Sequence, residues 1–249
     1  MISRADNSPF ARWWWTVDRP AFIAVMMLMF IGLVLAFAAS PAATGHADVA
    51  GNFSYALKQL AFAATAIIIL LGASLLGFKE TRVLAAAVFG LALIGACIAL
   101  LSGEDVNGAH RWIDFGGLKL QPSEFLKPAF AVLSAAFLAD KLKRGFPGEA
   151  VTLMLLAPAI GILLLQPDVG QTALLTTLCV AMLFFAGLPY YWLVALGLGG
   201  AGLGGIAYLV HPHVRERVNQ FLDPSTGYQT GLAMKAFQAG GFVGVGPGA

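Results

Sequence analysis

The sequence predicts an all-α integral membrane protein, a polytopic bundle of about seven transmembrane helices. Two observations support this fold class. Hydrophobic residues make up 59% of the 249 residues and charged residues only 11%, whereas a water-soluble domain has about 25% charged residues. The apolar residues also gather in runs of about 20, the length that a helix needs to cross the hydrocarbon core of a bilayer.

Seven runs are long and apolar enough, and each is expected to be a helix because a backbone in lipid must satisfy its own hydrogen bonds. They cover residues 20–40, 56–77, 83–102, 122–140, 149–166, 170–187 and 190–210. The fifth and sixth runs nearly touch across the polar hinge Gln166-Pro167-Asp168-Val169-Gly170. This hinge is therefore expected at a membrane surface or in a cavity.

Basic residues predict a cytoplasmic N-terminus by the positive-inside rule. With that orientation, four basic residues flank the outer ends of the first six spans and eight lie on the cytoplasmic side, namely Arg4, Arg12, Arg19, Lys79, Arg82, Lys141, Lys143 and Arg144. Residues 1–19 are then a cytoplasmic tail, in which three tryptophans from Trp13 to Trp15 suit an interfacial anchor. Residues 211–249, too polar and too rich in glycine to span, start a large outer loop.

Composition also excludes several classes of function. The net charge of +2 and the dispersed basic residues argue against a nucleic-acid partner and leave lipid and lipid-linked partners as the better hypothesis. Cys97 and Cys179 both lie inside apolar runs, so neither a disulfide framework nor a metal site is predicted from them. His211 and His213 lack further ligands, so no metal ligand is predicted there either.

Glu124 and Lys127 are the first candidate site residues. On a helix that begins near Pro122, positions i and i+3 share a face, so the carboxylate and the ammonium can meet just below the outer membrane surface. Ionisable groups at that depth usually face a cavity, where pairing lowers the desolvation penalty of each group, and we therefore expect a buried pair. The alternative, which stays open, is a snorkelling pair that marks the helix entrance.

Further candidates lie in the hinge and in the outer segment. Asp168, at the start of the sixth run, can complement the positive end of that helix or face the same cavity, and both interpretations stay open. Arg215 and Arg217 are suited to binding a phosphate, because a guanidinium is a planar, forked donor.

Three long stretches then resemble the SEDS family of cell-wall polymerases. They are "NGAHRWIDFGGLKLQPSEFLKPAF", "LLLQPDVGQTALL" and "NQFLDPSTGYQTGLAMKAFQAGGFVGVGPG", and they occur in the order and spacing of that family. The amino-acid sequences of the second and third stretches resemble the cell-division branch of the family more than the elongation branch. The resemblance runs from the first span to Ala249.

The resemblance implies a ten-span glycosyltransferase of the bacterial inner membrane that polymerises lipid II into glycan strands at the division septum. A class B penicillin-binding protein and other division membrane proteins are the implied partners. No organic cofactor is implied, and whether a divalent cation accompanies the substrate pyrophosphate stays open. By the motif match, Glu124 and Lys127 support the catalytic site, and the implied substrate-binding residues are Arg111, Gln121, Asp168 and Gln171.

The resemblance also implies a single SEDS-type membrane domain over residues 1–249, incomplete at its C-terminus. The catalytic aspartate of the family follows the glycine-rich segment, so its position falls beyond Ala249 and no residue here matches it. We therefore expect the 249 residues alone to make no glycan. Two other hypotheses stay open: a transporter that flips lipid II, and a non-catalytic division scaffold.

Overall fold

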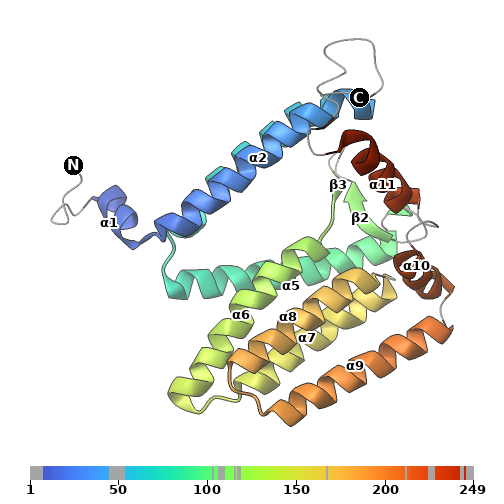
Figure 1. The fold of residues 1–249 in the computed structure, drawn as a ribbon. Helices are drawn as coiled ribbons and strands as arrows, with labels where there is room; N and C mark the ends of the chain where they lie inside the picture. Colours follow the sequence, from blue (N-terminus) through green and yellow to red (C-terminus); the bar gives the residue numbers. More distant parts are fainter. Residues whose placement is uncertain are drawn as a thin grey trace. The chain divides into compact units, whose positions relative to one another are not determined.

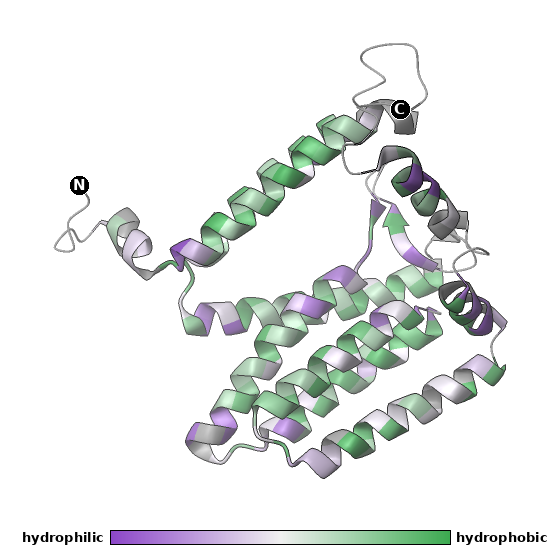
Figure 2. Cartoon of the chain, viewed as in Figure 1, coloured by the Kyte–Doolittle hydropathy of each residue, from purple (hydrophilic) through white to green (hydrophobic). Residues whose placement is uncertain are grey.

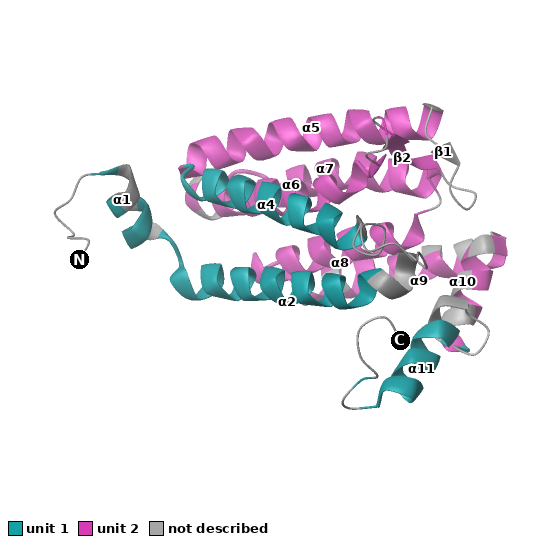
Figure 3. Ribbon diagram, turned by 90° about the horizontal axis from the view of Figure 1, so that it is seen from above, with its two compact units in different colours: residues 1–76, 223–249 teal, residues 77–222 magenta. Residues whose placement is uncertain are grey.

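A computed structural model describes residues 8–44, 54–102, 104–105, 110–114, 116, 119–166, 168–210, 212–223, 228–241 and 244. Helices dominate, and a small three-stranded sheet lies between two of them in sequence (Figure 1). The chain forms two compact units, coloured separately in Figure 3: residues 1–76 with 223–249, and residues 77–222.

The first unit contains α1 (Pro9–Thr16), α2 (Arg19–Thr44), α4 (Ser54–Ser74) and α11 (Tyr228–Gly240). The long helices α2 and α4 pack against each other. Short polar side chains cap the N-termini of α1 and α2. The Ser8 hydroxyl accepts a hydrogen bond from the Ala11 N–H at 3.2 Å, and the Asp18 carboxylate accepts one from the Ala21 N–H at 3.1 Å.

Aromatic residues connect α1 to the long helices of the first unit. The Trp13 indole Nε1 donates to Ser74 Oγ at the end of α4 at 2.7 Å. The Arg19 guanidinium lies 5.0 Å from the ring centroids of both Trp14 and Trp15, which is within the range of a cation–π interaction. These contacts hold α1 against α2 and α4, and the interfacial anchor stays a prediction.

The second unit contains the remaining elements. Its helices are α5 (Phe78–Ser102), α6 (Ser123–Arg144), α7 (Gly148–Leu165), α8 (Val169–Phe185), α9 (Tyr190–Val210) and α10 (Pro212–Leu222). α5, α6, α7 and α8 enclose an apolar core whose large buried side chains include Phe89, Leu126, Phe130, Leu163, Leu175 and Leu183. Hydrophobic residues cover most of the length of these helices, and hydrophilic residues gather at helix ends, on β2 and on α10 (Figure 2).

The sheet lies in the segment between α5 and α6. Its strands β1 (Glu104–Asp105), β2 (His110–Asp114) and β3 (Lys119–Leu120) are antiparallel in the order β1-β2-β3, with Trp112 opposite Glu104 and Ile113 opposite Leu120. β2 packs against α5. This contact holds the strand that carries Arg111 beside the bundle.

Charged contacts join α5, α6 and α7 at the end of the bundle where α6 ends. Arg82 Nη2 lies 2.8 Å from Asp140 Oδ2 and donates to the Ala136 carbonyl at 2.9 Å. Lys141 pairs with Glu149. The sheet lies at the other end, after α5 and before α6, so polar groups occupy both ends of the bundle and the core lies between them.

All seven predicted runs are helices, and five of them are long and apolar enough to cross a membrane: Arg19–Ser40, Tyr55–Ser74, Phe78–Leu101, Gly148–Leu165 and Tyr190–Val210. α6 falls outside this group because charged residues lie at both of its ends, from Glu124 to Arg144. α8 is apolar but has only 17 residues.

The segment after α9 contains two helices, α10 and α11, and its place in an outer loop stays a prediction. α10 is a helix because its apolar residues Val214, Val218 and Leu222 recur every four residues within a polar segment, which is the spacing of one helical face. The turn expected at Pro224 and Gly227 lies outside the described residues.

Candidate functional site

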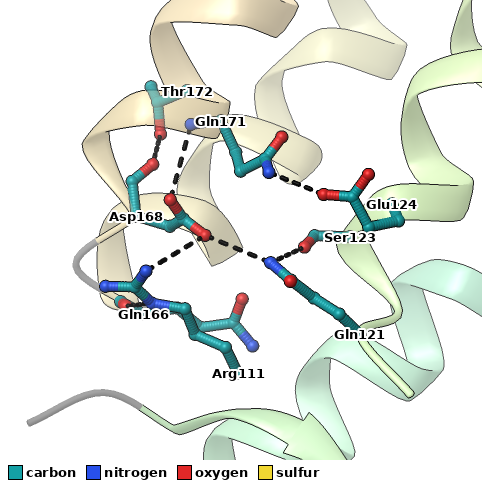
Figure 4. Close-up of polar contacts among 8 residues, drawn as sticks. All are labelled: Arg111, Gln121, Ser123, Glu124, Gln166, Asp168, Gln171 and Thr172. Carbon is teal, nitrogen blue, oxygen red and sulfur yellow. Dashed lines mark hydrogen bonds and ion pairs between the residues drawn. The ribbon is translucent and has the colours of Figure 1, made fainter. Parts of the chain in front are cut away.

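A connected group of polar side chains lies where β2 meets the ends of α6, α7 and α8 (Figure 4). We call it the polar cluster. Its members are Arg111 on β2; Gln121 before α6; Ser123, Glu124 and Lys127 on α6; Gln166 and Asp168 in the hinge; and Gln171 and Thr172 on α8. Every candidate residue predicted from the first two stretches belongs to it.

Asp168 makes three kinds of contact in the polar cluster. It is the N-cap of α8: its Oδ1 accepts from the Gln171 backbone N–H at 3.4 Å, and Thr172 Oγ1 donates to its carbonyl at 2.8 Å. Its Oδ2 lies 3.6 Å from Arg111 Nη1 and accepts from Gln121 Nε2 at 3.5 Å. Asp168 is 4% exposed. The first interpretation, in which Asp168 complements the start of the helix, is therefore confirmed, while a role in a cavity stays a prediction.

Arg111 fastens the sheet to both sides of the hinge. Its Nε donates to the Gln166 carbonyl at 3.3 Å, while its Nη1 faces the Asp168 carboxylate. The Arg111 side chain is 18% exposed, so most of it is buried. This geometry gives Arg111 and Asp168 a structural contact, and direct binding of substrate by either residue stays a prediction.

Gln166 and Ser123 belong to the cluster although neither was predicted as a site residue. Gln166 is 1% exposed, and its Nε2 donates to the Ala96 carbonyl of α5 at 2.9 Å. Ser123 is 3% exposed, and its Oγ accepts from Gln121 Nε2 at 3.0 Å. A sequence signal existed for Gln166, because an amide side chain between an apolar run and a Pro-Asp pair must find a partner when it is buried.

Glu124 and Lys127 form the predicted pair, with Nζ 2.6 Å from Oε2. The expectation that the pair is buried is wrong for the described chain: the Glu124 side chain is 48% exposed and the Lys127 side chain 22%. The reason is the rotation of α6. In its first turn Ser123 and Leu126 face the core, at 3% and 0% exposure, so Glu124 lies on the edge of the bundle.

Gln171 connects this pair to the rest of the cluster. Its Nε2 donates to Glu124 Oε1 at 2.7 Å, and its backbone N–H donates to Asp168 Oδ1 (Figure 4). The Glu124 carboxylate is therefore held from two sides, by Gln171 on α8 at one oxygen and by Lys127 at the other. The contacts thus run without a break from β2 to α6.

The predicted phosphate ligands of the outer segment are Arg215 and Arg217. Arg215 is exposed on α10, on the same side of the second unit as β2 (Figure 1). The side chain of Arg217 lies outside the described part of the chain. Phosphate binding by these two arginines stays a prediction.

Lys127 is the group of the polar cluster best suited to bind an anion. The cluster contains two cations, Arg111 and Lys127, each paired with a carboxylate, and three neutral amides. Within the described ranges, no group of three or more His, Cys, Asp or Glu side chains is arranged to hold a metal ion. Lys127 is partly exposed, and an ammonium has three N–H donors, of which the salt bridge to Glu124 uses one.

Relatives of known name match nearly the whole chain. It is 39% identical to the probable peptidoglycan glycosyltransferase FtsW of Caulobacter vibrioides, with 99% of this chain and 64% of the relative covered. It is 30% identical to the stage V sporulation protein E of Bacillus subtilis, with 91% of this chain and 64% of that protein covered. The chain thus spans less than two thirds of the length of these relatives.

Solved structures show the same fold. A chain of a peptidoglycan synthase complex that coordinates polymerization and crosslinking matches with a TM-score of 0.67 and 27% identity, covering 90% of this chain and 63% of that one. The rod shape determining protein RodA of Thermus thermophilus matches with a TM-score of 0.54 and 25% identity, covering 70% of this chain and 58% of that one.

The family model gives the same assignment as the individual relatives. The model of the FtsW/RodA/SpoVE family, described as cell cycle proteins, matches residues 19–249. Together with the apolar helices, this match makes the chain a multi-pass membrane protein. The chain belongs to the FtsW/RodA/SpoVE family, which is the SEDS family whose motifs its sequence resembles.

Proposed function

We propose that this protein is a peptidoglycan glycosyltransferase that polymerises lipid II into glycan strands during septal cell-wall synthesis. Family membership supports this activity, as do the relatives named as probable peptidoglycan glycosyltransferases over nearly all of the chain. The substrate of such a reaction carries a lipid diphosphate as leaving group. A protein that catalyses it needs a cation held near the outer membrane surface.

The anchored ammonium of Lys127 is the observation that carries the proposal. When the sugar is transferred, negative charge grows on the departing diphosphate, and a cation fixed beforehand stabilises that charge without reorganising. Lys127 is partly exposed near the start of α6, and Glu124 holds it through a salt bridge. Both Glu124 oxygens accept hydrogen bonds, so this carboxylate is better placed to orient Lys127 than to remove a proton.

The proposal includes an orientation and a partner. The positive-inside count supports an N-terminus in the cytoplasm and a polar cluster at the outer surface, where lipid-linked wall precursors are polymerised. A class B penicillin-binding protein and other division membrane proteins are the proposed partners at the septum. The match to a chain of a peptidoglycan synthase complex supports the first of these.

A divalent cation on the substrate diphosphate is also part of the proposal, since phosphate oxygens are the ligands that Mg²⁺ prefers. We expect EDTA to slow polymerisation and added Mg²⁺ or Mn²⁺ to restore it, measured as glycan formed per minute. Equal rates with EDTA and with metal would remove the cation from the scheme.

The test is polymerisation of purified lipid II. Because the 249 residues alone are expected to make no glycan, the whole product of the gene is expressed together with its class B partner, and glycan strands are resolved on a gel. We expect Lys127→Ala to lower kcat by about 10²- to 10³-fold, as for the loss of one preorganised donor to a developing charge. Lys143→Ala, an exposed lysine at the other end of α6, is the matched control and should keep the wild-type rate.

Two results would reject the proposal. The first is an absence of glycan with the wild-type complex under conditions in which a related polymerase is active. The second is full activity of Lys127→Ala. A crosslinked complex with the penicillin-binding protein that makes no polymer would favour the scaffold hypothesis instead.

Transport of lipid II is a weaker candidate. A transporter usually holds its substrate near the bilayer midplane, between broken helices. The polar cluster lies instead at the first turns of α6 and α8 and at the end of α7. Movement of fluorescent lipid II across proteoliposomes without polymer formation would favour the transporter.

A further inference from the structure

We propose that Gln171 is a positioning residue, which fixes the carboxylate of Glu124 and, through it, the ammonium of Lys127. The inference rests on the proposed function, because it assigns a role in the same reaction. Two observations support it: the hydrogen bonds that Gln171 donates, and the lack of a hydrogen bond to its amide oxygen from the described residues.

Gln171 donates hydrogen bonds from two different groups, one within the cap of its own helix and one across to α6. Its backbone N–H donates to Asp168 Oδ1 and belongs to the cap of α8, while its side-chain Nε2 donates to Glu124 Oε1 on α6 at 2.7 Å. The backbone hydrogen bond fixes the main chain of Gln171 to the buried carboxylate of Asp168. The side-chain hydrogen bond then holds Glu124, which lies on the exposed edge of the bundle, in a defined position relative to α8.

Glu124 needs this support because of its position. Its side chain is 48% exposed, and a long, half-exposed side chain held at one oxygen only keeps much of its rotamer freedom. Gln171 occupies Oε1 and Lys127 occupies Oε2, so the plane of the carboxylate is set from both sides. The location of the Lys127 ammonium follows from the location of that carboxylate.

The Gln171 amide has only one favourable orientation. Its Oε1 is shielded from solvent and accepts no hydrogen bond from the described residues. Turning the amide over would bring Oε1 against the Glu124 carboxylate, placing two acceptors face to face. The amide is therefore a directional donor and not an interchangeable polar group.

The shielded Oε1 also argues against a purely structural role. A buried acceptor without a donor costs stability, and an apolar side chain of similar shape would remove that cost. Gln171 lies on an apolar helix with its Oε1 in this position, so stability alone does not explain an amide there. The benefit is the hydrogen bond to Glu124.

The experiment separates positioning from stability with Gln171→Met. Methionine keeps the length of the side chain and removes both the donor and the unsatisfied oxygen. In the protein expressed from its own gene with its class B partner, we expect the melting temperature in detergent to be unchanged or higher, kcat for lipid II to fall about tenfold or more, and KM to change less than about twofold. Gln59→Met, an exposed glutamine near the start of α4, is the matched control and should match the wild type in all three.

A charge swap tests the contact itself. Gln171→Glu alone places two carboxylates together and should lower the melting temperature. Combining it with Glu124→Gln restores one donor and one acceptor between the two positions, so the double variant should melt above Gln171→Glu. A double variant no more stable than that single variant would show that the two side chains do not interact.

The inference fails if Gln171→Met leaves kcat at the wild-type value. It also fails if the variant loses stability and activity together, since that pattern is a structural one. A wild-type complex that makes no glycan would reject the proposed function instead, and the melting temperatures of the charge swap would still decide whether Gln171 holds Glu124.

Discussion

Asp168 illustrates what one side chain contributes when a helix begins inside a polar cluster. One oxygen of its carboxylate caps α8, and the other faces Arg111 and Gln121. The two contacts differ in what they require. The cap requires only an acceptor, whereas the interaction with Arg111 requires a charge.

This difference predicts that asparagine at position 168 lowers the free energy of unfolding less than alanine does. Asparagine is as good a cap as aspartate, so Asp168→Asn should lose only the ion pair with the mostly buried Arg111. Asp168→Ala should lose about 1 kcal/mol more in the free energy of unfolding, because it also removes the cap. Thermal unfolding in detergent measures both, with Glu216→Ala on the exposed face of α10 as control. Equal melting temperatures for the two variants would mean that the cap contributes nothing.

Exposure changes what is expected of the Glu124–Lys127 pair. A buried pair would cost about 3–5 kcal/mol when one partner is removed. At 48% and 22% exposure the pair resembles a surface salt bridge, so Glu124→Ala and Lys127→Ala should each change the free energy of unfolding by less than about 1 kcal/mol. Thermal unfolding of the two variants checks this, and a loss of several kcal/mol would show that the pair is shielded in the assembled protein.

At the scale of the element, the close packing of α6 and α7 depends on a missing side chain. A Cβ added to Gly148 would clash with the backbone carbonyl of Phe137 on α6, and neither backbone can move without disturbing its helix. Gly161 lies on the same helix, and nothing stands within 4 Å of the position its Cβ would take. The two glycines therefore have different reasons to be present.

We expect opposite signs for alanine at these two positions. Gly148→Ala should destabilise the protein by about 1–3 kcal/mol, as overpacking of a closed interface does. Gly161→Ala should be neutral or stabilise α7 by up to about 1 kcal/mol, because alanine is the better helix former. Melting temperatures of the two purified variants decide, and a silent Gly148→Ala would show that the helices separate easily.

At the scale of the whole molecule, α6 and α8 decide the topology. Seven spans place the end of α6 in the cytoplasm, whereas counting only the five long apolar helices as spans places it outside. Both counts put α10 outside when the N-terminus is cytoplasmic. Lys143, at the last turn of α6, is therefore the position that distinguishes the two topologies.

Cysteine labelling makes this distinction directly. In a background with Cys97 and Cys179 replaced by alanine, Glu216→Cys should react with an impermeant maleimide in intact spheroplasts. Lys143→Cys should react only after permeabilisation, because α6 crosses the membrane despite its charged ends. Labelling of Lys143→Cys in intact cells would leave α6 on the outer side and reduce the count of spans.

Local physics made much of the molecule predictable from the sequence. The length of an apolar run and the need to satisfy backbone hydrogen bonds in lipid depend on consecutive residues alone, so the helices and the membrane class follow from composition and order. The Glu124–Lys127 contact was predictable for the same reason, since i and i+3 meet on any helix. The family motifs identified Arg111, Gln121, Asp168 and Gln171 as residues of one site, and the structure brings them together in the polar cluster.

The tertiary structure decided which of these residues touch, and how exposed they are. Gln171 and Glu124 are 47 residues apart in the chain, and Gln166 and Ala96 are 70 apart. Such contacts depend on how α5, α6, α7 and α8 rotate and pack, which the periodicity of uniformly apolar helices does not specify. The rotation of α6 also turned Glu124 to the edge of the bundle, so the pair that helix geometry predicted is an exposed one that α8 must hold in place.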